Sequence, residues 1–451
     1  MIILAPNLSI RNIQTRPTRD SIAKVRTNTS ENFDLTVKIR SVGNHRHTLQ
    51  LDSQLNEDNT LKITFHAEND EKQLYEITFR IQPSRRLKSR GWKPLKVEGG
   101  QGFSAYRIYT IHPDGLIEDS VIIYQKPDTA NFLSHILDDT PLGAITLPGT
   151  HESCSLYGYP ISQCQQPATT IEQQLLDGIR FLDVRLRVVG DELLMYHGPR
   201  SQRSSMSKLL EVIHKFLEEH PSEFIILSIK QETPPWHPKF SFTLYQSFKP
   251  FLNKWFLEER IPKIGEVRGK GLLLTRINKF DKGHEEEQIR NGQWKEGFGI
   301  HPFIWPDSRK EGFDWDCAGT KFRTQDWYRV HTFLEIPEKF DTITNHLLPA
   351  VRQPTSSIIS DPTFTLSFLS ASYFPLSLPT IIAKGFGFPS WGLGIEGINS
   401  RMMKWLLDKY LKGEKVNACL LIDFYRQYGG NDIDNGLAEL LIQMNFTGNN
   451  A

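Results

Sequence analysis

The 451-residue sequence predicts an α/β protein: a (β/α)8 barrel (residues 129–451) preceded by an all-β, sandwich-like domain (residues 1–128). Before residue 128, apolar and polar residues alternate; after residue 144, short apolar segments alternate with amphipathic helical patterns. The run Lys126-Pro-Asp128 separates the regions with these two patterns, because proline follows the last strand pattern and a helical pattern begins at Asn131.

The composition is that of an ordinary globular protein. The chain carries 53 Lys and Arg against 52 Asp and Glu, a net charge of +1, so it has no global field to attract nucleic acid, and an anionic partner must meet a local patch. No stretch is apolar over the ~18 residues that a membrane span needs. Residues 1–6 lack the basic and apolar regions of a secretory signal. We therefore expect a monomer that is cytoplasmic or peripheral to a membrane, with leaderless secretion left open.

Five segments of the first domain alternate apolar and polar residues and are rich in β-branched and aromatic side chains. This pattern predicts an antiparallel sandwich in which each sheet has one solvated face. A basic stretch around Trp92 predicts either a solvated loop, which we favour, or a contact with anionic lipid. The segments are 33–40, 61–66, 75–81, 105–111 and 120–124, and the basic residues are Lys88, Arg90, Lys93 and Lys96.

Eight strand candidates follow in the second domain, separated by helical patterns that are clearest over residues 206–217 and 400–411. Eight βα units in about 300 residues suit a TIM-type barrel. The candidate strands are 144–148, 181–186, 193–197, 224–230, 271–277, 322–328, 364–370 and 418–424.

Polar residues stand at the ends of the first three strands. His151 and Glu152 follow the first, Asp183 and Arg185 lie on one face of the second, and His197 ends the third. In a parallel barrel such positions gather at one mouth. One imidazole can remove a proton while the other delivers one, and a guanidinium can hold phosphoryl charge. This set predicts phosphodiester cleavage without a metal ion.

The run Leu147-Pro-Gly-Thr-His-Glu-Ser153, then Gln165-Gln166, residues 171–185 and Tyr196-His-Gly198 resemble the catalytic X-region of phosphatidylinositol-specific phospholipase C. The closer resemblance is to its bacterial-type, single-barrel branch, and it covers about residues 130 to 445. The motifs in this order are specific, whereas Gly-Thr-His alone is not. The resemblance implies cleavage of membrane phosphatidylinositol to diacylglycerol and inositol 1,2-cyclic phosphate, with no cofactor.

The resemblance also implies individual roles. His151 is the general base that takes a proton from the inositol 2-hydroxyl, and His197 is the general acid that protonates the departing diacylglycerol oxygen. Arg185 contacts the phosphoryl oxygens, and Asp183 supports the proton relay. Asp423 matches the last-strand carboxylate that orients the base histidine. The alternative for Asp183 and Arg185 is a structural ion pair inside the barrel.

Glu152 stands where the bacterial enzymes carry aspartate, and its longer side chain could still reach His197 to form a hydrogen bond. Four further strand-end residues match the family's inositol-binding positions, with structural ion pairs as the alternative. They are Lys230, Arg276, Asp326 and Tyr328.

The segment 372–397 is unusually apolar for a loop. Aromatic side chains favour a lipid interface, so we expect a membrane contact there, and a packed cap on the barrel is an equal alternative. The expected contacts are Tyr373, Phe386, Phe388 and Trp391. Cys154 and Cys164 are close enough in sequence to bridge in an oxidising compartment, although reduced thiols are the favoured interpretation.

Two other functions are compatible with the sequence. One is a metal-dependent phosphodiesterase of the same superfamily, of glycerophosphodiesterase type, although such enzymes typically use a His-Arg pair where this chain has His151-Glu152. The other is a catalytically silent lipid-binding protein. The sequence predicts neither the role of the first domain nor the acceptance of phosphorylated inositides or glycosylated anchors.

Overall fold

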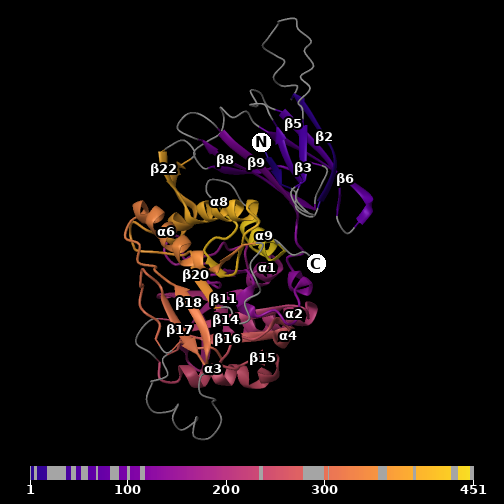
Figure 1. Cartoon of the computed structure of the whole chain (residues 1–451). Helices are drawn as coiled ribbons and strands as arrows, with labels where there is room; N and C mark the ends of the chain where they lie inside the picture. Colours follow the sequence, from indigo (N-terminus) through magenta and orange to yellow (C-terminus); the bar gives the residue numbers. More distant parts are fainter. Residues whose placement is uncertain are drawn as a thin grey trace, which may run out of the picture. The chain divides into compact units, whose positions relative to one another are not determined.

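The computed structural model forms two compact units (Figure 1): residues 1–126, 388–393 and 404–412, and residues 127–387, 394–403 and 413–451. The described residues are 2–4, 8–17, 37–41, 47–51, 59–67, 70–81, 91–98, 102–111, 117–232, 237–277, 299–302, 304–353, 363–389, 393–427 and 435–446.

Paired strands make up most of the described part of the N-terminal unit. One sheet has the order β3-β4-β1-β9-β8-β7 and the other the order β2-β5-β6. All neighbours are antiparallel except β1 and β9. The bounds are β1 (Ile2–Leu4), β2 (Leu8–Pro17), β3 (Val37–Ser41), β4 (His47–Leu51), β5 (Asn59–Ala67), β6 (Asp70–Ile81), β7 (Trp92–Leu95), β8 (Phe103–Ile111) and β9 (Ile117–Gln125).

Trp92, the aromatic residue of the basic stretch, is buried and lies 6.2 Å, centroid to centroid, from the ring of Tyr106. It is therefore a core residue of the sheet and not a lipid anchor. Lys88 and Arg90 lie outside the described residues.

The larger unit is built on a curled α/β sheet of TIM-barrel type with the order β15-β16-β14-β11-β10-β24-β20-β18-β17. The strands from β15 to β18 run parallel to their neighbours, and β17 is antiparallel to β18. The bounds are β10 (Leu147–Thr150), β11 (Phe181–Val189), β14 (Phe224–Gln231), β15 (Trp255–Phe256), β16 (Lys270–Thr275), β17 (Phe313–Cys317), β18 (Thr320–Gln325), β20 (Phe364–Phe368) and β24 (Cys419–Ile422).

The prediction of a parallel barrel strand at 193–197 is wrong. Its residues form β12 (Glu192–His197), which runs antiparallel to β11 and continues as a hairpin into β13 (Arg200–Ser205). Only Gly190 and Asp191 connect β11 to β12, and a parallel crossover needs a dozen or more residues. A different segment runs parallel beside β16, through a bridge between Leu274 and Ile300.

The other expected strands lie within a few residues of the observed ones. The largest shifts are at two strands. The first begins at Leu147 because Leu142–Ala144 forms a 3-10 turn, and the strand expected at 322–328 is Thr320–Gln325. The α-helices of the described ranges are α1 (Ile171–Leu176), α2 (Met206–Glu219), α3 (Phe240–Phe248), α4 (Ile264–Val267), α6 (Ile336–Leu347), α7 (Pro379–Lys384), α8 (Ile398–Leu411) and α9 (Gly436–Gln443). No helix among the described ranges is both long and apolar enough to cross a membrane.

The apolar core of the sheet contains the first residue of five parallel strands. These residues belong to one buried cluster, so apolar side chains fill the end at which the strands begin. The opposite, carboxyl ends of the strands are left to carry polar side chains. The five residues are Leu147, Phe181, Phe224, Phe364 and Cys419.

A buried ion pair anchors the segment that leads into this sheet. Arg180 lies 2.8 Å from Glu223, and neither side chain is exposed. The same guanidinium donates to the backbone carbonyls of Thr129, Ala130 and Leu175. Both charges are therefore paired, which burial of a charge requires.

Candidate active site

His151 directly follows β10 and lies between residues of the two neighbouring strands. Its Nδ1 is 2.9 Å from Oδ1 of Asp423, which follows β24, and its Nε2 is 3.0 Å from Nη2 of Arg185 on β11. Guanidinium N–H groups only donate, so Nε2 must hold the lone pair of the ring. The Nδ1–H group therefore donates to Asp423, and the tautomer of His151 is fixed from both sides.

The imidazole of His151 is held in its neutral form. Burial, and next the charge of Arg185, keep its pKa well below the usual value. Burial also raises the pKa of Asp423 well above that of an ordinary carboxyl. Gln165 fixes the backbone here, since its side-chain amide donates to the carbonyls of His151 and Ile422. His151 is thus a rigidly held, neutral base.

Glu152 does not make the expected hydrogen bond to His197, because its Oε1 is 4.0 Å from Nδ1 of that ring. The same oxygen lies 2.7 Å from Nε of Arg185, which takes the carboxylate instead. The hydroxyl of Ser155 donates to the other oxygen at 2.8 Å. Burial raises the pKa of Glu152 despite the opposing charge of Arg185. The Glu152 side chain therefore holds Arg185 in place and is not a hydrogen-bond partner of His197.

His197 stands on the hairpin and not on a parallel strand. Its Nδ1 is 3.6 Å from Sγ of Cys164, a buried thiol. The turn after it is fixed by Glu232, whose carboxylate accepts the backbone N–H of Gly198 at 2.7 Å and lies 3.6 Å from Arg185. The sequence did not identify Cys164 as a neighbour of His197, nor Glu232 as a residue of the site. The available signal for Glu232 was its position two residues after Lys230, near the end of β14.

Asp183 is buried and ionised. Burial acts to raise its pKa, but Arg276, Arg185 and His151 hold the pKa at about 2. Its Oδ1 pairs with the guanidinium of Arg276, and its Oδ2 lies 3.9 Å from Nη2 of Arg185 and 4.0 Å from Nε2 of His151. Asp183 therefore balances two arginines beside the base.

The side chains expected to bind inositol lie next to this cluster. Arg276 is nearly buried, with Nη1 3.8 Å from Asp326 and its guanidinium carbon 4.7 Å from the ring centre of Trp305. The indole N–H of Trp305 donates to Asp326 at 2.8 Å. Arg185, and next burial, lower the pKa of Lys230 to about 8. Positive charge therefore surrounds the base on the side of β14 and β16.

Tyr328 turns its hydroxyl to Asp307, to which it donates a hydrogen bond. The strand ends beside it are tied by Lys339, a buried lysine that was not among the residues predicted from the sequence. Its Nζ donates to the carbonyls of Trp327 at 2.6 Å and Phe368 at 2.9 Å. Lys339 thereby holds the ends of β18 and β20 together.

The apolar segment is only partly described. Tyr373 and Phe386 are 46% and 48% exposed, and the Phe386 ring also stacks on Phe333 with centroids 4.6 Å apart. Phe388 ends β21 (Gly385–Phe388), but its side chain and Trp391 lie outside the described residues. The described part of this segment therefore has both solvent-exposed aromatic side chains and an aromatic side chain that packs on the rest of the unit.

Cys154 and Cys164 are both free and buried, so the alternative of a bridge between them is not realised. Burial raises the pKa of Cys154 to about 12 and that of Cys164 well above its usual value. Ligand atoms of His151, Cys164 and Asp423 lie within 4.8 Å of one another, a spacing that a metal ion can use. Two of these atoms already form the hydrogen bond that orients the base.

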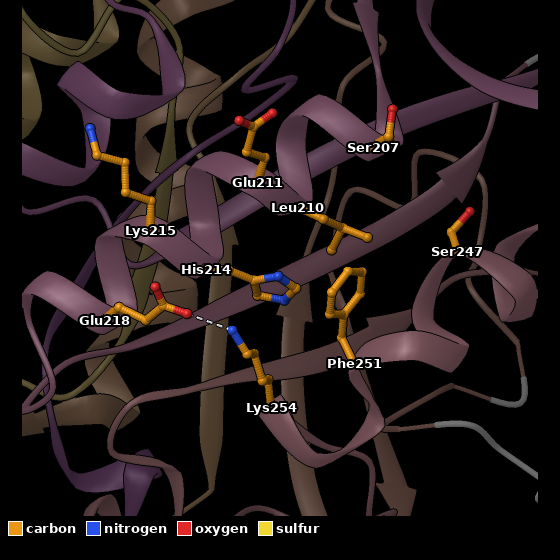
Figure 2. Close-up of a pocket in the computed structure, with 9 residues that line it drawn as sticks. All are labelled: Ser207, Leu210, Glu211, His214, Lys215, Glu218, Ser247, Phe251 and Lys254. Atoms are coloured by element: carbon orange, nitrogen blue, oxygen red, sulfur yellow. Dashed lines mark hydrogen bonds and ion pairs between the residues drawn. The ribbon is translucent and has the colours of Figure 1, made fainter.

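A separate pocket of ≈ 560 Å³ lies on the outer helices, between α2 and the turn after α3 (Figure 2). In it the ring of His214 packs 4.7 Å from that of Phe251, and Lys254 pairs with Glu218 at 2.6 Å. None of the expected site residues that the structure describes lines it. The lining residues are Ser207, Leu210, Glu211, His214, Lys215, Glu218, Ser247, Phe251 and Lys254.

Residues 150–277 match the family model described as phosphatidylinositol-specific phospholipase C, X domain. A relative named 1-phosphatidylinositol phosphodiesterase, from Listeria monocytogenes, is 33% identical over 160 residues, covering 33% of this chain and 49% of the relative. A protein of the same name from Staphylococcus aureus strain Newman is 23% identical over 232 residues, covering 49% of this chain and 70% of the relative. The chain thus spans about half the length of the Listeria relative, and the resemblance predicted from the motifs is confirmed.

Solved structures agree at the level of the fold. The phosphatidylinositol-specific phospholipase C of Listeria monocytogenes is 21% identical with a TM-score of 0.50, covering 70% of this chain and 99% of that one. A structure of the Staphylococcus aureus enzyme, studied for its membrane binding, is 20% identical with a TM-score of 0.53, covering 70% and 97%. The larger unit therefore has the α/β fold of these proteins.

Proposed function

From the match to this X domain, we propose that the chain is a phosphatidylinositol-specific phospholipase C that forms diacylglycerol and inositol 1,2-cyclic phosphate. The observation that carries the proposal is the position of His151 between Asp423 and Arg185, because it joins a neutral base to a fixed positive charge. The name of the curated relatives, 1-phosphatidylinositol phosphodiesterase, supports the substrate class.

In the first step, Nε2 of His151 takes the proton of the inositol 2-hydroxyl, and the oxygen of that hydroxyl attacks phosphorus. Arg185 leaves Nε2 and turns its planar fork to the phosphoryl oxygens, since an anion attracts it more strongly than a neutral ring does. Asp423 then faces an imidazolium through the same hydrogen bond at Nδ1. Asp423, already in place, meets the charge that forms on the ring, and Arg185 meets the charge at phosphorus once it has turned.

In the second step, His197 donates a proton to the diacylglycerol oxygen as its bond to phosphorus breaks. The Nδ1 of His197 faces Cys164, so Nε2 is the nitrogen assigned to the leaving oxygen. Lys230, Arg276, Asp326 and Tyr328 are assigned to the inositol hydroxyls. Asp183 keeps Arg276 and Arg185 in position beside them.

The remaining assignments follow the same resemblance. Residues 1–128 are proposed to form a sandwich-like domain whose role is not assigned, and residues 129–451 an eight-stranded catalytic barrel. The segment 299–302 is proposed as a further parallel strand of this barrel, in place of the expected strand at 193–197, and its bridge to β16 supports this. Tyr373, Phe386, Phe388 and Trp391 are proposed to contact the membrane, on which the protein acts as a peripheral monomer.

The test uses the purified chain, phosphatidylinositol vesicles and EDTA, with the phosphorus product identified by NMR. We expect the cyclic phosphate, and we expect His151→Ala and His197→Ala each to lose about two or more decades of rate. A diester with a nitrophenol leaving group, which needs no proton, should partly rescue His197→Ala only. The matched control is His220→Ala, a histidine at the end of α2 that hydrogen-bonds Asn131.

Other outcomes would favour the rival functions. Loss of turnover in EDTA with recovery on adding calcium, but not on adding zinc, would indicate a metal-dependent phosphodiesterase. Vesicle binding by the folded chain with no turnover would indicate a silent lipid-binding protein. Near-native rates in both histidine variants would mean that the catalytic site lies elsewhere.

A further inference from the structure

A second group of metal-ligand side chains lies outside the active site. Ligand atoms of Glu259, His301 and Cys317 all lie within 4.8 Å of one another. Glu259 follows β15, His301 follows the segment that bridges to β16, and Cys317 ends β17. Three separate segments thus bring a carboxylate, an imidazole and a thiol to one point, with the thiol buried and the other two half-buried.

The group stands at a seam of the curled sheet. Among the strand pairs of the described ranges, none joins β16 to β17 or β18. Ile300, the residue before His301, bridges to Leu274 on one side of the seam, and Cys317 pairs with Thr320, the first residue of β18, on the other. The backbone N–H of Ile261 donates to the Thr320 hydroxyl at 3.3 Å, which brings the Glu259 segment to the same place.

One ring nitrogen of His301 has a backbone partner. Nδ1 of His301 lies 3.2 Å from the carbonyl oxygen of Gly299, and a carbonyl only accepts. Nδ1 therefore carries the proton, and Nε2 holds the lone pair. Donation of the second ring N–H to a backbone carbonyl is the usual support of a metal-bound histidine, because it fixes both tautomer and ring direction.

The nearest arginine in the sequence does not compete for the carboxylate in this arrangement. Arg260 lies 2.7 Å from Glu258 and also pairs with Glu266, so its charge is directed to those two side chains. The Glu259 carboxylate is left on the side of His301 and Cys317.

We propose that Glu259, His301 and Cys317 bind a zinc ion. Thiolate, imidazole and carboxylate together suit Zn²⁺ better than Mg²⁺ or Ca²⁺, which take oxygen ligands. Metal–ligand bonds of about 2.0–2.3 Å put tetrahedral ligand atoms about 3.3–3.8 Å apart. From a spacing within 4.8 Å, side-chain shifts of about 1 Å suffice. Binding releases the thiol proton to solvent, and water takes the fourth position.

The ion has a structural role in this proposal. It joins the two sides of the seam, where hydrogen-bonded strand pairing is not observed in the described part of the sheet. Cys317 lies beside the beginning of β18, whereas Asp326 of the active site follows its end. The site is thus distinct from the proposed catalytic cluster.

The test is cobalt substitution, because Co²⁺ occupies zinc sites and a thiolate ligand gives it a near-ultraviolet charge-transfer band. Untagged, chelator-treated protein is titrated with Co²⁺ and then with Zn²⁺. We expect one ion per chain with the thiolate band, and a thermal midpoint that rises with Zn²⁺, since an ion that binds only the folded state stabilises it. Cys317→Ser should lose the band, and Glu259→Gln, which keeps shape near the surface, should bind at least about tenfold more weakly.

Cys164→Ser is the matched control, because Cys164 belongs to the other group of ligand-type side chains. It should keep the band and the affinity. Three results with the cobalt band would overturn the proposal: no thiolate band in the unsubstituted chain, an unchanged band in Cys317→Ser, or a band lost in Cys164→Ser. If Cys317→Ser fails to fold, Glu259→Gln still tests the proposal. Unchanged zinc affinity in folded Glu259→Gln would also contradict it.

Discussion

Arg185→Lys is the sharpest test of the active site, because it keeps the charge and removes the fork. In the structure, the three nitrogens of Arg185 face three different groups. Nε is 2.7 Å from Glu152, Nη1 is 3.6 Å from Glu232, and Nη2 is 3.0 Å from Nε2 of His151. Lysine has a single nitrogen and no planar pair of donors, so it cannot hold two phosphoryl oxygens while remaining paired with Glu152.

The magnitude follows from the donors that are lost. Removing one preorganised donor to a developing oxyanion costs about 10²–10³ in kcat, about 2.7–4 kcal/mol. We expect a loss of this size in kcat for Arg185→Lys, with a smaller change in KM because the charge remains. Arg185→Met, which leaves Glu152 and Glu232 without this counter-charge, should in addition lower the free energy of unfolding by about 3–5 kcal/mol.

The assay is steady-state cleavage of phosphatidylinositol in vesicles, with EDTA or with calcium, alongside urea unfolding of each variant. Arg187→Lys is the matched control, because it lies on the same face of β11 but its guanidinium sits over the ring of Tyr196, 5.0 Å from the centroid. It should keep near-native kcat. The unsubstituted chain should keep full activity in EDTA and gain nothing from calcium, since a cation beside Arg185 is repelled.

Two results would refute this reasoning. Arg185→Lys with kcat within about tenfold of the unsubstituted chain would mean that a point charge is enough. Activity lost in EDTA and restored by calcium would mean that a metal ion, and not Arg185, supplies the charge at phosphorus.

Three further predictions concern other parts of the larger unit. Lys230, with a pKa of about 8, should be a cation below that pH and neutral above it. KM should therefore rise above about pH 8 in the unsubstituted chain but not in Lys230→Arg. Identical pH profiles of the two proteins would contradict the assignment of Lys230 to substrate binding. Glu223→Gln should lower the free energy of urea unfolding by about 3–5 kcal/mol, because it leaves Arg180 buried without an anion, and a loss below about 1 kcal/mol would argue against that pair. Replacing Tyr373 and Phe386 with alanine should weaken vesicle binding but spare cleavage of a short-chain soluble substrate, whereas equal loss on both would indicate a packed cap.

The features predicted correctly are those that local pattern determines. Apolar runs of four to eight residues located the strands, and period-two alternation put Asp183 and Arg185 on one face. The same alternation occurs in parallel and antiparallel strands, so it could not give the direction of β12. The two-residue link of Gly190 and Asp191 carried that information, because only a hairpin can be so short.

The partners of the site residues could not be predicted in the same way. Glu152 pairs with Arg185 because the guanidinium reaches across from the neighbouring strand, a distance that sequence spacing does not encode. Cys164 comes from a loop and Glu232 from beyond a strand end, and each reaches the site only through the tertiary fold. The seam group joins segments far apart in the chain for the same reason.

The hairpin β12–β13 gives the two proposed proton carriers different local stabilities. His151 is attached to a strand paired on both sides within the sheet. His197 is on a hairpin that, among the described strands, pairs to the sheet through β11 alone. Elements with fewer neighbours open at lower free energy than the core, so amide hydrogen exchange should be faster in the hairpin than in β10 and β24. On warming, a population should therefore arise in which the base is still held and the acid is displaced. Such molecules would still turn over diesters with leaving groups that need no proton, and the preference for those substrates should increase before the barrel unfolds.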